Sequence, residues 1–164
     1  MGLTLADSRR GEKLLWPDFA SPQVRKLKDP MHFVVSCVRA SYEDKAILNT
    51  GPMQTWLNRA AEGLYNRQTP DGYPLTTSAW TSSGQMSSRF ELARTIGGGS
   101  AGLFKSEDPA RPTEMPAFPQ LANGMYYELI AGTLGASTRA ALDKAGTPQE
   151  WNTLFLSSPE FMYR

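Results

Sequence analysis

Apolar positions along this chain recur mostly at helical spacing, and no stretch shows the sustained two-residue alternation of a half-buried strand. The clearest stripe consists of Met53, Trp56, Leu57, Ala60, Ala61 and Leu64. These positions share one face of an amphipathic helix, with polar residues on the other face. We therefore expect a helix that begins after Thr50-Gly-Pro, continues to Leu64 and turns this stripe toward the core.

A second helix is predicted from Asp29-Pro30 onward. Aspartate is a good N-cap, and proline suits the first helical position because its missing N–H is not needed there. Residues 31–40 are nearly all apolar, which predicts a central helix buried on most sides. The β-branched pair Val34-Val35 leaves a strand as the alternative, but the capping signals favour a helix.

A third helix is expected from about Ser82 to Ile96, capped by Thr81 or Ser83 and ended by Gly97-Gly-Gly. We expect its apolar side to consist of Met86, Phe90, Ala93 and Ile96. A fourth helix is indicated by the spacing of Phe118, Leu121, Ala122, Met125, Tyr126, Leu129 and Ile130.

Shorter elements are expected at both ends of the chain. The start signals predict a helix capped by Ser137 that runs through Ala145, a helix from the capping box Thr147-Pro-Gln-Glu150 through Phe155, and a last turn at Ser158-Pro-Glu. A short helical piece is expected near residues 3–15.

The fold class that follows is all-α: a single domain over residues 1–164, with about six helices. One long Gly/Pro-rich connection interrupts it at residues 97–119, which contain four glycines and four prolines. This composition cannot continue a helix, so we expect a flexible connection or a lid.

Composition excludes several classes of protein. Seventeen basic against sixteen acidic residues argue against nucleic acid as a partner, because such binders concentrate positive charge. A single cysteine and a single histidine exclude a Cys/His zinc cluster, and we expect no metal and no cofactor. No apolar run approaches the ~20 residues that span a bilayer. The first residues lack the pattern of an export signal, so the chain is expected to be a soluble product or a fragment of something longer.

A polar stripe on the otherwise apolar helix offers one candidate for chemistry. Asp29, His32, Ser36 and Arg39 are spaced by three, four and three residues, so they share a face. Acid, imidazole and hydroxyl in that order suggest a hydrolase triad. However, mid-helix amides are already bonded and cannot form an oxyanion hole. The structural interpretation is favoured: Asp29 caps the helix, Ser36 bonds back to a carbonyl, and Arg39 pairs with an acid such as Glu43.

The segment Gly97-x-Gly99-x-x-Gly102 matches the dinucleotide-binding fingerprint letter for letter. That fingerprint works only between a strand and a helix, where the helix N-terminus faces the pyrophosphate. Here it follows a helix and leads into proline-rich chain, so we interpret it as a helix stop.

The loop from Thr69 to Trp80 carries the most distinctive residues. Pro70-Asp-Gly-Tyr has the composition of a tight turn, and Trp80 is expected to anchor the loop beside the next helix. The candidate binding residues are Arg39, Arg67, Asp71, Tyr73, Trp80 and Arg89. Together they could form a polar pocket with an aromatic wall, as small-ligand sites are commonly built. The favoured interpretation is an ordered connection in which these groups satisfy the backbone and fill the core.

Several segments together resemble one protein family. Asp29-Pro-Met-His-Phe-Val-Val-Ser-Cys-Val-Arg-Ala40 is similar to a segment of the large bacterial proteins grouped as domain of unknown function family 1800 (DUF1800). The likeness continues through Thr69-Pro-Asp-Gly-Tyr-Pro, Ala79-Trp80 and Met86-Ser-Ser-Arg-Phe90, and closes with Leu156-Ser-Ser-Pro-Glu-Phe161. The residues that match best are Ser36, Arg39, Asp71, Gly72, Tyr73, Trp80 and Arg89. Glu91 stands where the family pattern suggests Asn.

The resemblance implies a C-terminal part of a longer architecture, in which many members look exported. It implies no activity. The function expected from the sequence is a helical interaction or ligand-binding module, whose partner is the N-terminal region of a longer family member or a small ligand. The alternatives are a hydrolase-type enzyme whose active site is completed by such a region, and a pure scaffold.

Overall fold

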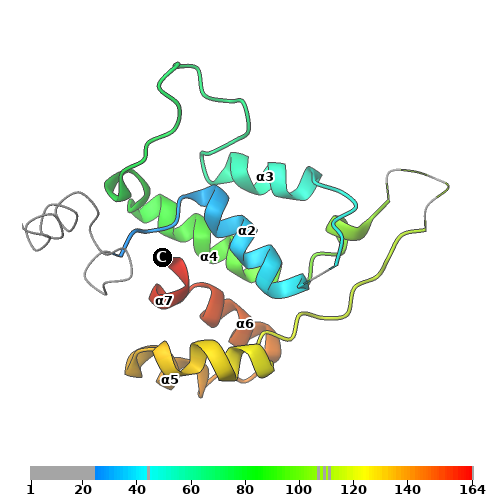
Figure 1. Cartoon of the computed structure of the whole chain (residues 1–164), viewed down its shortest axis with the longest axis vertical. Helices are drawn as coiled ribbons and strands as arrows, with labels where there is room; N and C mark the ends of the chain where they lie inside the picture. The colour runs from blue at the N-terminus through cyan, green and yellow to red at the C-terminus, as the bar shows by residue number, and fades with distance from the viewer. Residues whose placement is uncertain (1–24, 44, 107, 109, 111, 164) are drawn as a thin grey trace, which may run out of the picture.

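The computed structural model describes residues 25–43, 45–106, 108, 110 and 112–163, and in this part of the chain the regular elements are helices. The predicted all-α class is confirmed. Three helices, α2, α4 and α6, lie at the centre, with α3 on one side and α5 on the other (Figure 1). The short helix predicted near residues 3–15 lies outside the described residues.

Helix α2 spans Pro30–Tyr42 and begins as its capping signals predict. The carboxylate of Asp29 accepts a hydrogen bond from the His32 backbone N–H at 2.8 Å, and Pro30 occupies the first turn. The alternative of a strand at Val34-Val35 is therefore wrong. Local capping chemistry outweighs the β-branched pair here.

Helix α3 spans Gly51–Arg59 and ends a full turn before the predicted limit at Leu64. The chain leaves the helix at Ala61, whose φ of 61° lies in the left-handed region. The apolar stripe is therefore used only in part, because Trp56, Leu57 and Ala60 are buried while Leu64 is exposed. Helical spacing continued in the sequence after the helix itself had ended.

Helix α4 spans Ser83–Gly97 and is capped by Ser82, whose hydroxyl accepts from the Gln85 N–H at 3.3 Å. The predicted cap at Thr81 or Ser83 is therefore wrong by one residue. The left-handed residue that follows the helix is Gly99, with φ of 94°. Phe90, expected on the apolar face, is 44 % exposed.

The C-terminal third of the described chain contains three short α-helices, and the sequence predicts the N-caps of the last two correctly. Helix α6 spans Pro148–Leu156 and α7 spans Pro159–Met162, capped by Thr147 and Ser158 as predicted. Helix α5 spans Ala136–Leu142, and its N-cap is Gly135, so the predicted cap at Ser137 is wrong.

The fourth predicted helix is present only in its second half. Residues 118–123 are not helical, and the helical turn from residue 124 is irregular: a π-turn, η3 (Tyr126–Ile130), leads into a 3-10 turn, η4 (Ala131–Thr133). Leu129 is exposed, so the apolar spacing of this segment does not form one buried face. Pro116 precedes the segment and Pro119 lies within it, and residues before proline avoid the helical region.

The Gly/Pro-rich connection contains a short 3-10 turn, η2 (Ala101–Phe104). Leu103 and Phe104 within it are completely buried, and the Leu103 carbonyl accepts hydrogen bonds from the N–H groups of Leu48 and Asn49. The first part of the connection is thus anchored in the core beside α3. The expectation that residues 97–119 are flexible stays a prediction for the remainder.

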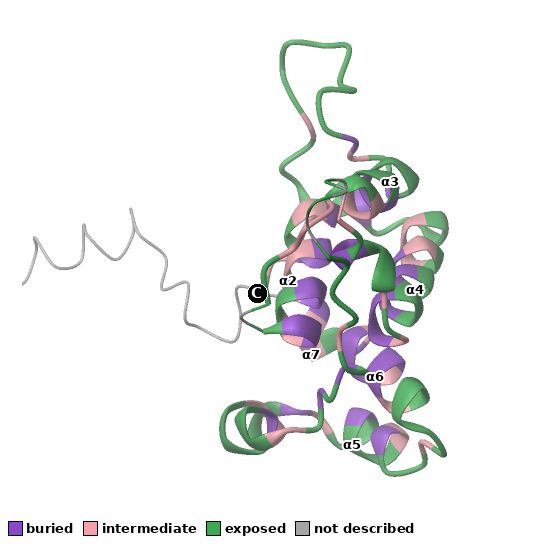
Figure 2. Cartoon of the chain, turned by 90° about the vertical axis from the view of Figure 1, so that its right-hand side faces the viewer, coloured by how far each residue is buried: buried purple, intermediate pink, exposed green. Residues whose placement is uncertain are grey.

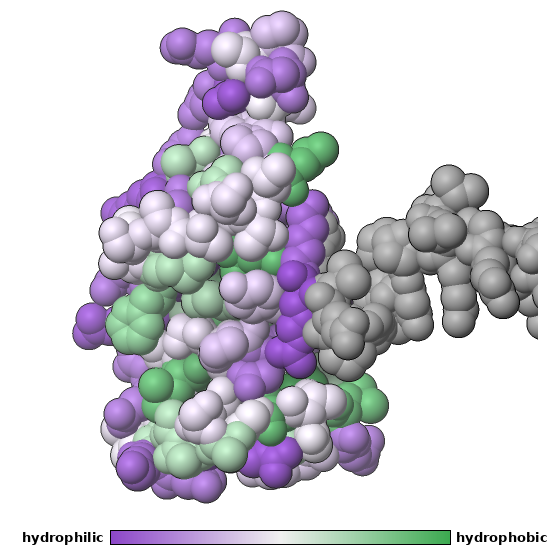
Figure 3. All heavy atoms as spheres, turned by 90° about the vertical axis from the view of Figure 1, so that its left-hand side faces the viewer, coloured by the Kyte–Doolittle hydropathy of each residue, from purple (hydrophilic) through white to green (hydrophobic). Residues whose placement is uncertain are grey.

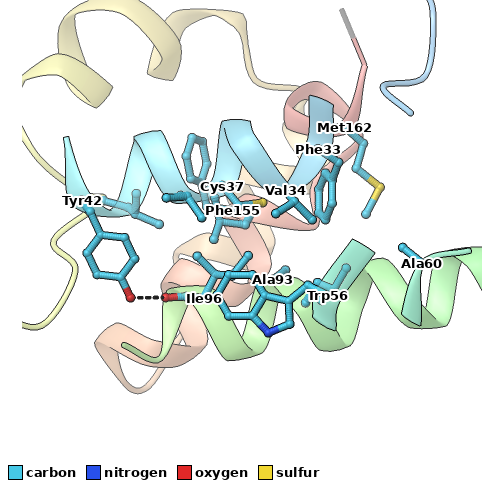
Figure 4. Packing of buried hydrophobic residues seen from close by; sticks show 14 of the residues in the cluster. Phe33, Val34, Cys37, Tyr42, Trp56, Ala60, Ala93, Ile96, Phe155 and Met162 are labelled. Carbon is cyan, nitrogen blue, oxygen red and sulfur yellow. Dashed lines mark hydrogen bonds between the residues drawn. The ribbon is translucent and has the colours of Figure 1, made fainter. Parts of the chain in front are cut away.

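The core lies where α4 packs against α2 and α6 (Figure 4). Phe33, Cys37 and Ile96 have no exposed surface, and burial raises the pKa of the Cys37 thiol, so it behaves as a small apolar side chain. At one end of α2, the Tyr42 hydroxyl donates to the Ile96 carbonyl at 3.3 Å. Buried residues line the facing sides of these helices (Figure 2).

The two ends of the described chain lie side by side. Leu27 and Tyr163 form an isolated antiparallel bridge, and the Lys28 N–H donates to the Met162 carbonyl at 3.0 Å. The Lys28 ammonium also donates to the Phe161 carbonyl at 2.6 Å and lies 4.3 Å from the centre of the Phe161 ring. These contacts hold helix α7 against the segment that enters α2.

Candidate functional site

The most prominent feature outside the core is the projecting loop, residues 61–76, which extends away from the helices (Figure 1). Nearly all of it is exposed (Figure 2). Its outer end is mostly hydrophilic, and hydrophobic side chains lie lower, toward the body of the molecule (Figure 3). This loop contains three of the six candidate residues predicted from the sequence.

Those three residues do come together. The Arg67 guanidinium lies 3.6 Å from the Asp71 carboxylate and 5.8 Å from the centre of the Tyr73 ring. Beside them is an open pocket of about 440 Å³, lined by Asn58, Ala61, Gly63, Asn66, Arg67, Gln68, Thr69 and Tyr73. Three of the six candidate residues therefore lie together, and Tyr73 forms an aromatic side of this pocket.

Hydrogen bonds within the loop fix its shape. The Tyr73 hydroxyl donates to the Gly63 carbonyl at 2.7 Å, and the Asn66 amide donates to the Asn58 side-chain oxygen at 2.7 Å. Trp80, buried as expected for an anchor, donates from its indole N–H to the Pro74 carbonyl at 3.0 Å. The base of the loop is therefore closed by two aromatic side chains that each bond to a backbone carbonyl.

The Asp71 side chain is largely exposed, and the pKa of its carboxyl lies below the ordinary value. A hydrogen bond from the Thr69 side chain contributes most to this shift, and Arg67 adds a smaller electrostatic contribution. Asp71 is therefore ionised at neutral pH, and the Arg67–Asp71 pair leaves the pocket with little net charge.

Arg89 lies away from the loop, which corrects the expectation that it joins the pocket. It is completely buried, donates from Nη2 to the Lys28 carbonyl at 2.7 Å, and lies 5.2 Å from the centre of the Phe33 ring. Burial lowers the pKa of its guanidinium, and the negative charges of Asp29 and Glu62 partly oppose that shift. Its Nε and Nη1 atoms have no hydrogen-bond partner among the described residues.

Arg39 lies in the last turn of α2 with an exposed side chain, and it also takes no part in the loop pocket. The expected pair with Glu43 does not form: the Glu43 carboxylate instead accepts from the Asn123 amide at 3.1 Å. Over the described ranges, the ion pairs are His32–Asp29 and Arg67–Asp71. The six candidates are therefore split among three places.

The polar stripe on α2 forms an acid–imidazole contact but no triad. His32 Nδ1 lies 2.7 Å from both carboxylate oxygens of Asp29, which also caps the helix. No hydrogen bond joins Ser36 to His32 in the part of the chain that the structure describes. Within the same residues, no group of His, Cys, Asp and Glu side chains is arranged to hold a metal ion.

The sequence gives no signal for the exposure of several large apolar side chains. Tyr65 is fully exposed at 102 %, Leu75 is 80 % exposed and Leu64 is 45 % exposed. Tyr65 also has a φ of 59°, a left-handed conformation that is strained for a bulky residue. Because this segment is not helical, helical spacing predicts neither which of its side chains are buried nor which backbone conformation they adopt.

No helix in the described residues is both long enough and apolar enough to cross a bilayer. The chain matches no curated protein and no solved structure. A family described as "Protein of unknown function (DUF1800)" matches residues 13–163, nearly the whole chain. The protein is thus a member of the DUF1800 family, as the segments around α2, the projecting loop and α7 indicated.

Proposed function

We propose that this chain is a helical interaction module that binds a polypeptide partner through the projecting loop. The observation that carries the proposal is the exposure of Leu64, Tyr65 and Leu75 on the two limbs of one loop. Large apolar and aromatic side chains of this kind form the centres of protein interfaces, where they enter pockets on the partner.

The loop is built to hold these side chains in place before a partner binds. The bonds from Tyr73 to the Gly63 carbonyl and from Trp80 to the Pro74 carbonyl close both limbs near their base. Tyr65 has a left-handed φ of 59°, and its ring is fully exposed. A loop ordered in advance loses less conformational entropy on binding.

The partner is expected to offer an apolar pocket with a polar rim. Apolar side chains from both limbs of the loop would enter the partner's pocket. Arg67, which is partly exposed, and Asp71, which is largely exposed, would face its polar rim. In longer members of the family, the N-terminal region is the natural partner, because a covalent link raises its effective concentration near the loop. A small ligand in the pocket beside Tyr73 is the alternative for the same loop.

The proposal is tested by mixing this chain with the separately produced N-terminal region of a longer family member and measuring Kd by calorimetry. Tyr65→Ser is expected to weaken binding by about tenfold or more, since interface anchors contribute more than about 1.4 kcal/mol. The matched control is Leu129→Ser, which removes another exposed apolar side chain far from the loop and should leave Kd within about twofold. Absence of binding, or equal effects of the two changes, would overturn the proposal.

The enzyme alternative has one contact in its favour, the Asp29–His32 pair, because a carboxylate that orients an imidazole is part of a hydrolase triad. A nucleophile would then have to come from outside the described residues. A hydrolase activity that survives in the His32→Gln variant would exclude this role for the pair.

A further inference from the structure

A second pocket lies between η3 and the start of α6, and α6 lies at the opposite end of the molecule from the projecting loop (Figure 1). Its volume of about 340 Å³ falls in the usual range of small-molecule sites, roughly 300–1,000 Å³. We name it the aromatic pocket, lined by Gln120, Ala122, Tyr127, Ala145, Gly146, Thr147, Pro148, Trp151 and Asn152.

None of these lining residues is charged, although one residue in five of the whole chain is charged. The Glu150 carboxylate, on the adjoining helix, is already engaged: it accepts a hydrogen bond from the Gly146 N–H at 2.9 Å. An ionised ligand would lose hydration here without gaining an opposite charge. The pocket therefore favours a neutral ligand.

Two aromatic rings of this pocket are held by a third ring behind them. The Tyr126 ring lies 4.9 Å from the ring centres of both Tyr127 and Trp151, nearly perpendicular to each. Trp151 stacks in turn on Phe155 at 5.4 Å, which extends the cluster into the core. Edge-to-face packing of this kind is stabilising and sets the rings in place without a ligand.

The two adjacent tyrosines of the π-turn η3 face different ways. Tyr126 is buried, while Tyr127 is 65 % exposed. An exposed tyrosine ring supported from behind offers a flat apolar face to a ligand. Turns of this type are frequent at functional sites.

Hydrogen-bonding groups surround the rings. The Gln120 amide carries both donors and an acceptor, and the Thr147 hydroxyl, which accepts from the Glu150 N–H at 3.1 Å, still has a proton to donate. Asn152 serves as a fixed wall instead, because its amide donates to the carbonyls of Gly97 at 2.9 Å and Pro119 at 2.8 Å. Neutral donors and acceptors thus lie around an aromatic face.

We propose that the aromatic pocket binds one ring of a neutral saccharide. A sugar ring is uncharged, has an apolar C–H face that packs on an aromatic face, and carries hydroxyl groups at its edge that both donate and accept. The ring of Tyr127 would contact that face, while Gln120 and Thr147 would bond to the edge. This site is separate from the projecting loop and does not depend on the function proposed for it.

The test uses the full chain titrated with neutral disaccharides, namely cellobiose, maltose and chitobiose, and observed by NMR. At least one sugar should shift the Trp151 indole resonance saturably. Tyr127→Ala should weaken that binding by about tenfold, the effect of removing one stacking ring. Gln120→Ala, a second exposed change, should weaken it by a smaller factor.

The matched control is Tyr65→Ala, which removes the other strongly exposed tyrosine, on the projecting loop, and should leave the sugar affinity unchanged. The proposal fails if no disaccharide shifts Trp151 up to its solubility limit, or if Tyr127→Ala and Tyr65→Ala weaken binding equally. It also fails if a neutral flat aromatic compound such as caffeine binds in the aromatic pocket and none of the three disaccharides does.

Discussion

The core around α2 and the projecting loop are both rich in aromatic side chains, but different forces hold them. In the core, Phe33 and Ile96 have no exposed surface and are held by burial on all sides. In the projecting loop, Tyr73 is only partly buried and donates one hydrogen bond to the Gly63 carbonyl, and most of its neighbours in the loop are exposed. The loop can therefore open locally while the core stays folded, as regions with few buried contacts do.

Truncating one aromatic side chain in the core should have the largest effect. Phe33→Ala is expected to lower the free energy of unfolding by about 3–5 kcal/mol, because it removes buried surface and leaves a cavity. Leu75→Ala in the loop should change it by less than about 0.5 kcal/mol. Urea unfolding of both variants measures the difference, and equal effects would mean that the loop is part of the cooperative core.

Variants of Arg89 test whether a buried polar side chain stabilises the core through its charge or through the space that it fills. Arg89→Ala should cost about 2–4 kcal/mol, since it removes the bond to the Lys28 carbonyl and leaves space beside Phe33. Arg89→Met fills most of that space and removes a buried charge with unpaired donors, so it should cost about 1 kcal/mol or less. A larger loss in the Met variant, by the same urea assay, would show that the charge itself is required.

Glu160 tests polar contacts at a third place, where α7 meets α5. Its carboxylate accepts from the Gly135 N–H and from the Thr138 hydroxyl, both at 2.8 Å. Burial alone would raise the pKa of Glu160, but these hydrogen bonds outweigh it and hold the pKa below its ordinary value.

A carboxyl whose pKa is lower in the folded state contributes stability above its ordinary pKa, and that contribution is lost as the pH falls through the folded value. Glu160→Gln should therefore cost about 0.5–1 kcal/mol at neutral pH. The gap from the unmodified protein should close below about pH 4. Thermal melts over a pH series measure this, and a gap that widens in acid would contradict the assignment.

The smallest effect is expected for Asp71→Ala in the loop. The Asp71 side chain is largely exposed and pairs with Arg67 across 3.6 Å, so the melting temperature should not change. If the loop binds a partner, the same change should weaken binding. A large drop in melting temperature would instead favour the interpretation of the loop as a purely structural connection.

The sequence predicted the helices best where a cap defines their start. Asp29, Thr147 and Ser158 cap α2, α6 and α7 as expected, because capping depends on a few neighbouring atoms. Periodicity failed where burial depends on distant packing: the spacing of Leu64 and Phe90 is helical, yet both are exposed. Burial depends on how the helices pack together, so the helical spacing of apolar residues does not predict it alone.

The candidate site was predicted in part for a similar reason. Arg67, Asp71 and Tyr73 come together because they are close in sequence and a tight turn joins them. Arg39 and Arg89 were expected at the same place, but long-range packing sends one to the surface of α2 and the other into the core. The aromatic pocket had no signal in the sequence, since it depends on a π-turn meeting the start of α6.

The bridge between Leu27 and Tyr163 also sets how the molecule responds to mechanical force. Because the two bridged segments run antiparallel and their outer ends lie side by side, a pull on both ends would load the bridge and the Lys28–Met162 hydrogen bond one after the other. Contacts loaded one after another break at low force, so helix α7 would separate first from the segment that precedes α2. Tension along a longer polypeptide would therefore detach the C-terminal turn while the packing of α2 on α4 still holds.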